Sequence, residues 1–186
     1  MTPRLTDSQT VDASVPAITE FLTQMVKETG AEEVNLIAHS MGNLSLIRAL
    51  DQITPASPDA KPFRKIILAA PDVDRRVFDQ LAKAYGVVAH QTTMYVSSED
   101  RALWSAGIVW GNPRAGYAQP PRLDPLVVSG IDTIDVTHMD LSWLGHSTFA
   151  TARAVLTDLY QILWNDLPPD RRNLRLHQPP GDWQFP

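Results

Sequence analysis

A serine in the first half of the sequence has the neighbours that a catalytic nucleophile needs. Ser40 lies in the pentapeptide Ala38-His39-Ser40-Met41-Gly42, with a small residue two positions before it and another two positions after it. Where a strand turns sharply into a helix, larger side chains at these positions would clash. Such a turn exposes the serine hydroxyl and directs the next backbone N–H toward a developing oxyanion. The pattern predicts Ser40 as a nucleophile and Met41 as an oxyanion donor; the alternative is a capped helix with an incidental serine.

A nucleophilic serine needs a histidine base within hydrogen-bond reach and a carboxylate that orients this base. His39 adjoins the serine, but adjacent residues in this turn project in different directions, so we expect it to line the pocket or to pack. His146 follows the last expected strand and directly precedes the last expected helix, and His138 lies closer to the strand end. We predict His146 as the base and keep His138 as the alternative.

Helical and strand patterns alternate along the chain. Apolar residues at helical spacing predict a first helix that starts near Asp12 or Ser14 and has Pro16 in its first turn. Short apolar runs predict four buried strands, at Val34–Ala38, Lys65–Ala70, Thr92–Val96 and Ile131–Val136. Such alternation is typical of a parallel sheet with helices on both faces. We expect one α/β domain over residues 1–166, followed by a Pro-rich surface tail over residues 167–186.

The order of the strands selects the acid. The carboxyl ends of parallel strands meet at one edge of a sheet, so residues that follow different strands can form one site. Asp100 follows the second strand after the one that leads to Ser40, which is the usual position of the acid. Asp72 follows the intervening strand, and loop chemistry after Pro71 would also explain it. We predict Asp100 as the acid and keep Asp72 as the alternative.

The composition excludes several other classes of protein. With 44% apolar and 20% charged residues, the 186-residue chain has the composition of one globular domain. A net charge of −5 without a basic stripe argues against nucleic acid. The absence of cysteine excludes a thiolate nucleophile and sulfur-ligated metals, and no metal or organic cofactor is implied. Without an apolar membrane segment or a signal peptide in the sequence, the default expectation is a cytoplasmic protein.

Several separate motifs, in order, carry a resemblance to a known superfamily. They lie at Val34–Asn43, Leu68–Asp74, Tyr95–Leu103, Ile134–Val136 and Gly145–Ser147. From Ser14 to about Leu163, the chain resembles a bacterial, esterase- or lipase-like branch of the α/β-hydrolases that is known only as a domain of unknown function. The resemblance implies a serine hydrolase with the triad Ser40, Asp100 and His146, acting on a small-molecule ester or acyl substrate.

The sequence departs from this superfamily at its N-terminus. The fold normally has several strands before the helix that leads to the nucleophile, and one of their loops carries the second oxyanion donor. Since nothing before Ser14 supplies them, we expect a truncated domain. The alternative function is therefore a weak or inactive remnant that acts as an interaction module and self-associates through the sheet edge beside Val34–Ala38.

One long segment shows no period. Gly107–Pro125 is rich in Gly and Pro and contains Trp110 and Tyr117. Long aperiodic loops are usually functional or disordered. With Trp104, these aromatic residues predict either a lid over a lipid-like acyl group or simple packing.

Overall fold

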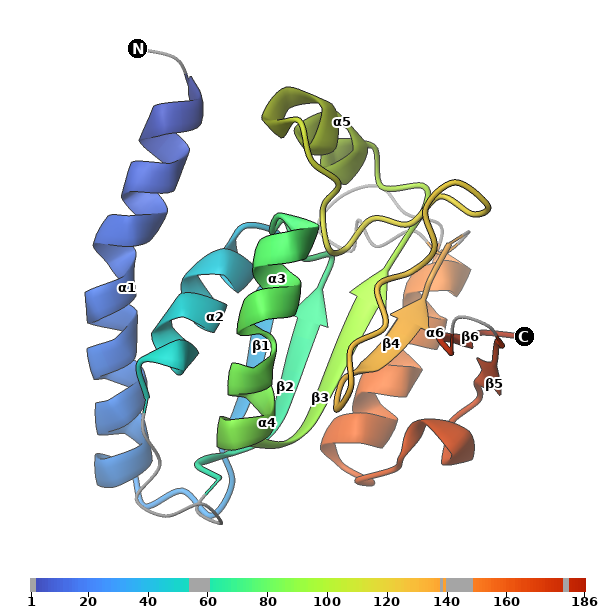
Figure 1. The fold of residues 1–186 in the computed structure, drawn as a ribbon. Coiled ribbons are helices and arrows are strands. Elements are labelled where there is room, and N and C mark those ends of the chain that lie inside the picture. Colours follow the sequence, from blue (N-terminus) through green and yellow to red (C-terminus); the bar gives the residue numbers. More distant parts are fainter. Residues whose placement is uncertain (1–2, 54–60, 138, 140–148, 179–180) are drawn as a thin grey trace.

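The computed structural model describes residues 3–53, 61–137, 139, 149–178 and 181–186 (Figure 1). The helices are α1 (Pro3–Glu28), α2 (Gly42–Asp51), α3 (Arg75–Leu81), α4 (Lys83–Val88), α5 (Arg101–Trp110), α6 (Phe149–Leu163) and the 3₁₀ helix η1 (Pro169–Arg171). The strands are β1 (Asn35–His39), β2 (Phe63–Ala69), β3 (Ala89–Val96), β4 (Asp132–Asp135), β5 (Arg175–Leu176) and β6 (Trp183–Gln184). No helix in the described part of the chain has the length and apolar character to cross a membrane.

The strands form one sheet in the order β1-β2-β3-β4-β6-β5. All neighbouring pairs are parallel except β5–β6, which is antiparallel. The expected α/β architecture with a parallel sheet is therefore confirmed, although six strands are described instead of about four. The two additional strands come from the segment after residue 167, which the sequence predicts as a surface tail. This segment is added to the sheet because β6 pairs with β4 through Ile134↔Trp183 and Asp135↔Gln184.

Alternating residues of the strands point into two separate cores. Ile66, Leu68 and Met94 lie in the larger core, which is covered by α1, α2, α3 and α4. Ile67 and Tyr95 lie in the smaller core, which is covered by α6 and the C-terminal segment. Helices therefore cover both faces, as the alternation of elements predicted (Figure 1).

The first helix is longer than the sequence pattern suggests. It starts at Pro3, so Pro16 lies in its interior and not in its first turn. A proline in a helix leaves the carbonyl four residues earlier without its usual donor. Pro16 and Asp12 both lie on the exposed face of α1, where water can satisfy that carbonyl. The cost of the proline is reduced there, and the buried side of α1 holds Val11, Val15 and Leu22.

Strand β1 lies at one edge of the described sheet, and the prediction of a buried strand holds for only one of its two faces. Leu36 and Ala38 pack against the larger core. Ile37, on the other face, is 50% exposed, and Asn35 and His39 beside it are also exposed. The smaller core begins only at β2, with Ile67, so it does not cover this face of β1.

Candidate active site

Ser40 lies at the turn between β1 and α2 with a backbone φ of +51°. A non-glycine residue in this left-handed region is strained by about 1–3 kcal/mol, so the surrounding structure must hold it there. The Ser40 N–H donates to the carbonyl of Ala69 at 3.0 Å. The Ser40 carbonyl accepts from the backbone N–H of Asn43 at 3.2 Å and from that of Asp72 at 3.1 Å. Hydrogen bonds from two elements therefore fix the strained turn.

The side chain of Asn43 stabilises the turn further through two hydrogen bonds that the sequence analysis does not predict. Its Nδ2 donates to the carbonyls of Ser40 at 2.9 Å and Ala69 at 3.3 Å, and the side chain is fully buried. Asn43 thus ties β1, β2 and the start of α2 together beneath the serine. The only signal in the sequence is an amide side chain on the mainly apolar buried side of a helix.

The other residues of the pentapeptide differ in their surroundings. Met41 has helical backbone angles, and its N–H donates to no backbone carbonyl among the described residues. A Cβ built on Gly42 would meet no described atom within 4 Å outside its chain neighbours and the first turn of α2, so the clash that predicts a small residue at this position is not seen. Ala38 is half-buried against the larger core. His39 is exposed, which argues against packing and leaves its expected place in the lining of the pocket as a prediction.

Asp100 follows β3 at the same edge of the sheet as Ser40, which follows β1. One strand separates β1 from β3, which places the two strands about 10 Å apart. Asp100 caps α5, since its Oδ1 accepts from the Leu103 N–H at 2.9 Å. The loop before it is fixed by two bonds: the Glu99 N–H donates to Ser97 Oγ at 3.1 Å, and the Ser98 N–H to Thr137 Oγ1 at 3.0 Å.

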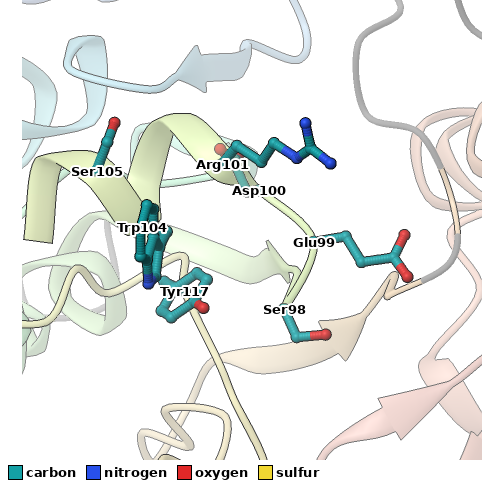
Figure 2. A pocket seen from close by; sticks show the side chains of 7 residues that line it. All are labelled: Ser98, Glu99, Asp100, Arg101, Trp104, Ser105 and Tyr117. Carbon is teal, nitrogen blue, oxygen red and sulfur yellow. The ribbon is translucent and has the colours of Figure 1, made fainter.

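A cleft of about 860 Å³ opens beside Asp100. Its lining residues are Ser98, Glu99, Asp100, Arg101, Trp104, Ser105 and Tyr117 (Figure 2). Burial raises the pKa of Tyr117, so its phenol stays neutral and can donate a hydrogen bond. Trp104 is half exposed on α5. The cleft therefore combines two carboxylates that follow a strand end, Glu99 and Asp100, with an aromatic wall of Trp104 and Tyr117.

Asp72, the alternative acid, is engaged by a buried arginine. Its carboxylate forms an ion pair with Arg114 Nε, and its carbonyl accepts from an Arg114 terminal nitrogen at 3.0 Å. Arg114 is only 7% exposed and lies 5.9 Å from the centre of the Trp110 ring. A second, smaller cavity of about 180 Å³ is lined by both Met41 and Asp72, so it borders the turn at Ser40.

Asp74, which also lines the smaller cavity, caps α3. Burial alone would raise its pKa, but the backbone N–H groups of Arg76 and Val77 and the Arg76 side chain together lower it. Asp74 is therefore a stable anion whose charge is used at the start of α3.

The segment Arg114–Ala118, called here the clip, joins the part of the site around Ser40 to the part around Asp100. It lies within the aperiodic stretch Gly107–Pro125, whose first four residues belong to α5. The Gly116 N–H donates to the Pro71 carbonyl at 2.9 Å, and its carbonyl accepts from the Ser97 N–H at 3.0 Å. The clip thus connects the loop that supports Ser40 with the loop that leads to Asp100.

The predicted bases His138 and His146 lie outside the described residues. The strand that precedes them in the sequence, β4, ends at the edge of the sheet that carries Ser40 and Asp100. In the described part of the chain, no group of three or more His, Asp or Glu side chains is placed to hold a metal ion.

A mostly parallel sheet with a serine at a strained strand-to-helix turn, and an aspartate after the second strand along the same edge, is an arrangement found in α/β-hydrolases. A family model described as "Alpha/beta hydrolase of unknown function (DUF900)" matches residues 3–164. The chain belongs to this family, and the predicted kind of protein, a hydrolase, is thereby supported. No curated protein and no solved structure matches the chain.

Proposed function

We propose that this protein hydrolyses carboxylic esters through an acyl-enzyme, with Ser40 as the nucleophile, His146 as the base and Asp100 as the acid that orients it. The observation that carries the proposal is the strained conformation of Ser40, at φ +51°, in a turn held by four hydrogen bonds. Backbone strain of this kind persists only where the surrounding structure enforces it, and it is concentrated at functional sites.

The arrangement supports a defined sequence of steps. Ser40 Oγ attacks the ester carbonyl while the imidazole of His146 takes its proton, and the Met41 N–H stabilises the oxyanion that forms. The imidazole then returns the proton to the departing alcohol, and water releases the acyl group by the same steps. Asp100 uses Oδ1 to cap α5, which leaves Oδ2 to accept from the imidazole.

Labelling with a fluorophosphonate tests the proposal, because this reagent reacts covalently with activated serines. We expect the folded chain to be labelled, the label to be lost in Ser40→Ala, and the control Ser129→Ala, at an exposed serine outside the cleft, to react normally. Asp100→Asn should lower the rate by up to about 10⁴-fold, as when the orienting acid of a serine triad is neutralised. A folded chain that does not react, or that still reacts in Ser40→Ala, contradicts the proposal.

In the described part of the chain, no strand pairs with the outer side of β1, and this favours a second candidate, an interaction module without catalytic activity. The Val34 carbonyl and the Ser40 N–H bond to the β2 side. Since backbone groups alternate along a strand, those of Asn35, Ile37 and His39 face away from β2. This edge carries no charge or proline that would protect it from pairing with another chain.

Sedimentation velocity separates the two candidates. A module that self-associates through β1 should show a concentration-dependent oligomer that Ile37→Lys disrupts, whereas the exposed control Val87→Lys should not. A stable monomer that hydrolyses a short-chain ester at enzymatic rates would exclude the second candidate.

A further inference from the structure

We propose that Arg114 is a positioning residue for the nucleophile, and that it acts through Asp72 and the clip. This inference rests on the proposed function of Ser40. It gives Asp72 a role different from that of a triad acid, because Asp72 then holds the elbow and does not orient the base.

The first step is the contact between Asp72 and the elbow. The Asp72 N–H donates to the Ser40 carbonyl at 3.1 Å, from outside the strand and helix that flank the serine. Ser40 needs such support because its backbone is in the left-handed region. A shift of Asp72 therefore changes the direction of the Ser40 peptide and, with it, the position of the hydroxyl.

The second step is the contact between Arg114 and Asp72. Its guanidinium contacts both the carboxylate and the carbonyl of Asp72, so it fixes the side chain and the backbone of the same residue. The planar, forked donor set of arginine makes this two-point contact, which a lysine ammonium cannot reproduce with the same geometry. With Arg114 buried against the Trp110 ring, little water competes for these bonds.

The third step connects the Arg114–Asp72 contact to the proposed acid, Asp100. Two residues after Arg114, Gly116 bonds to Pro71 on one side and to Ser97 on the other. The clip therefore sets the spacing between the loop that supports Ser40 and the loop that leads to Asp100. Catalysis by a triad depends on this spacing, and a misplacement of about 1 Å can cost a hundredfold in rate.

The experiment measures the second-order rate constant for fluorophosphonate labelling of the full chain as a function of pH. Arg114→Ala and Arg114→Lys should both lower the plateau rate by about ten- to a hundredfold. The pH midpoint should not move, because the base and its acid are intact. Low, non-denaturing concentrations of guanidinium should partly restore Arg114→Ala, and sodium chloride should not.

Two further variants separate positioning from loss of fold. The double variant Arg114→Met with Asp72→Asn removes both charges together and leaves no buried charge unpaired. It should unfold cooperatively in urea and yet react slowly. Arg122→Ala, at an exposed arginine in the segment that follows the clip, should react like the wild type.

The possible outcomes distinguish this inference from the function on which it rests. If the folded wild-type chain is not labelled, the proposed function fails and the role of Arg114 fails with it. If the wild type reacts and folded Arg114→Ala reacts equally fast, only the role of Arg114 is refuted. A shift of the pH midpoint in Asp72→Asn, with normal labelling of Asp100→Asn, would make Asp72 the acid and would also overturn the inference.

Discussion

Replacing Gly116 with alanine should break the connection that the clip makes between the loop that supports Ser40 and the loop that leads to Asp100. A Cβ at this position would lie 2.5 Å from the Pro71 nitrogen, 2.7 Å from the Ala70 carbonyl carbon and 2.8 Å from Pro71 Cδ. These are backbone and ring atoms that cannot rotate away, so the clip and the loop must separate.

The separation acts against the hydrogen bonds that hold Gly116 in place. Its N–H bonds to Pro71 and its carbonyl to Ser97. An added methyl group in a well-packed site costs about 1–3 kcal/mol. Loss of one or both hydrogen bonds adds about 0.5–1.5 kcal/mol for each. We therefore expect Gly116→Ala to lower the free energy of unfolding by about 1.5–6 kcal/mol.

Urea unfolding followed by circular dichroism measures this loss, with Gly86→Ala as the matched control. Gly86 is exposed in α4, and a Cβ there meets no described atom within 4 Å. This control should be stabilised by about 0.5–1 kcal/mol, because alanine favours the helix. An unfolding midpoint of Gly116→Ala that equals or exceeds that of the wild type would refute the reasoning about the clip.

Three further predictions concern buried polar side chains. Tyr85→Phe should be at least as stable as the wild type, because the Tyr85 hydroxyl has no hydrogen-bond partner among the described residues. Burial also raises the pKa of this phenol, so urea titrations should show the wild type losing stability as the pH rises above about 10. The variant, which lacks the phenol, should lose less. Asn43→Ala should cost about 1–3 kcal/mol in urea unfolding, since it removes two neutral hydrogen bonds at the turn that holds Ser40. Fluorophosphonate labelling should also become slower; unchanged labelling would show that these two hydrogen bonds are not needed to position Ser40. Arg172→Ala should cost about 3–5 kcal/mol at pH 7, because it leaves the buried Asp158 carboxylate with the Tyr95 hydroxyl but without its cationic partner. Burial raises the pKa of Asp158, so the loss of stability should shrink as the pH falls and the carboxyl takes up a proton. The exposed control Arg171→Ala should show neither effect.

Local sequence patterns predicted the sheet and the elbow because both depend on neighbours along the chain. The apolar runs before Ser40, Asp72 and Asp100 form parallel strands, and all three residues follow strands at the same edge. Hydrophobic period and strand order are short-range signals, so they survive in a single sequence.

Other features were wrong or missing in the sequence prediction because they depend on distant contacts. The sequence pattern predicts a start of α1 near Asp12 or Ser14, later than the observed start at Pro3, because a capping residue and Pro16 are stronger local signals than the weak pattern before them. The exposure of Ile37 depends on which strand is the last in the sheet, and the pairing of Trp183 with Ile134 joins residues far apart in sequence. Periodicity cannot report either one.

By itself, the sequence determined that Ser40 stands between a strand and a helix and that Asp100 follows a strand further along the chain. Only the tertiary structure decided how Ser40 is held, because Asn43, Asp72 and Arg114 act through hydrogen bonds across elements. It also decided that the carboxylate of Asp72 is bound by Arg114, whereas that of Asp100 caps a helix beside an open cleft. The physical reason is that the residue type sets which hydrogen bonds are possible, and the packing of distant segments sets which of them form.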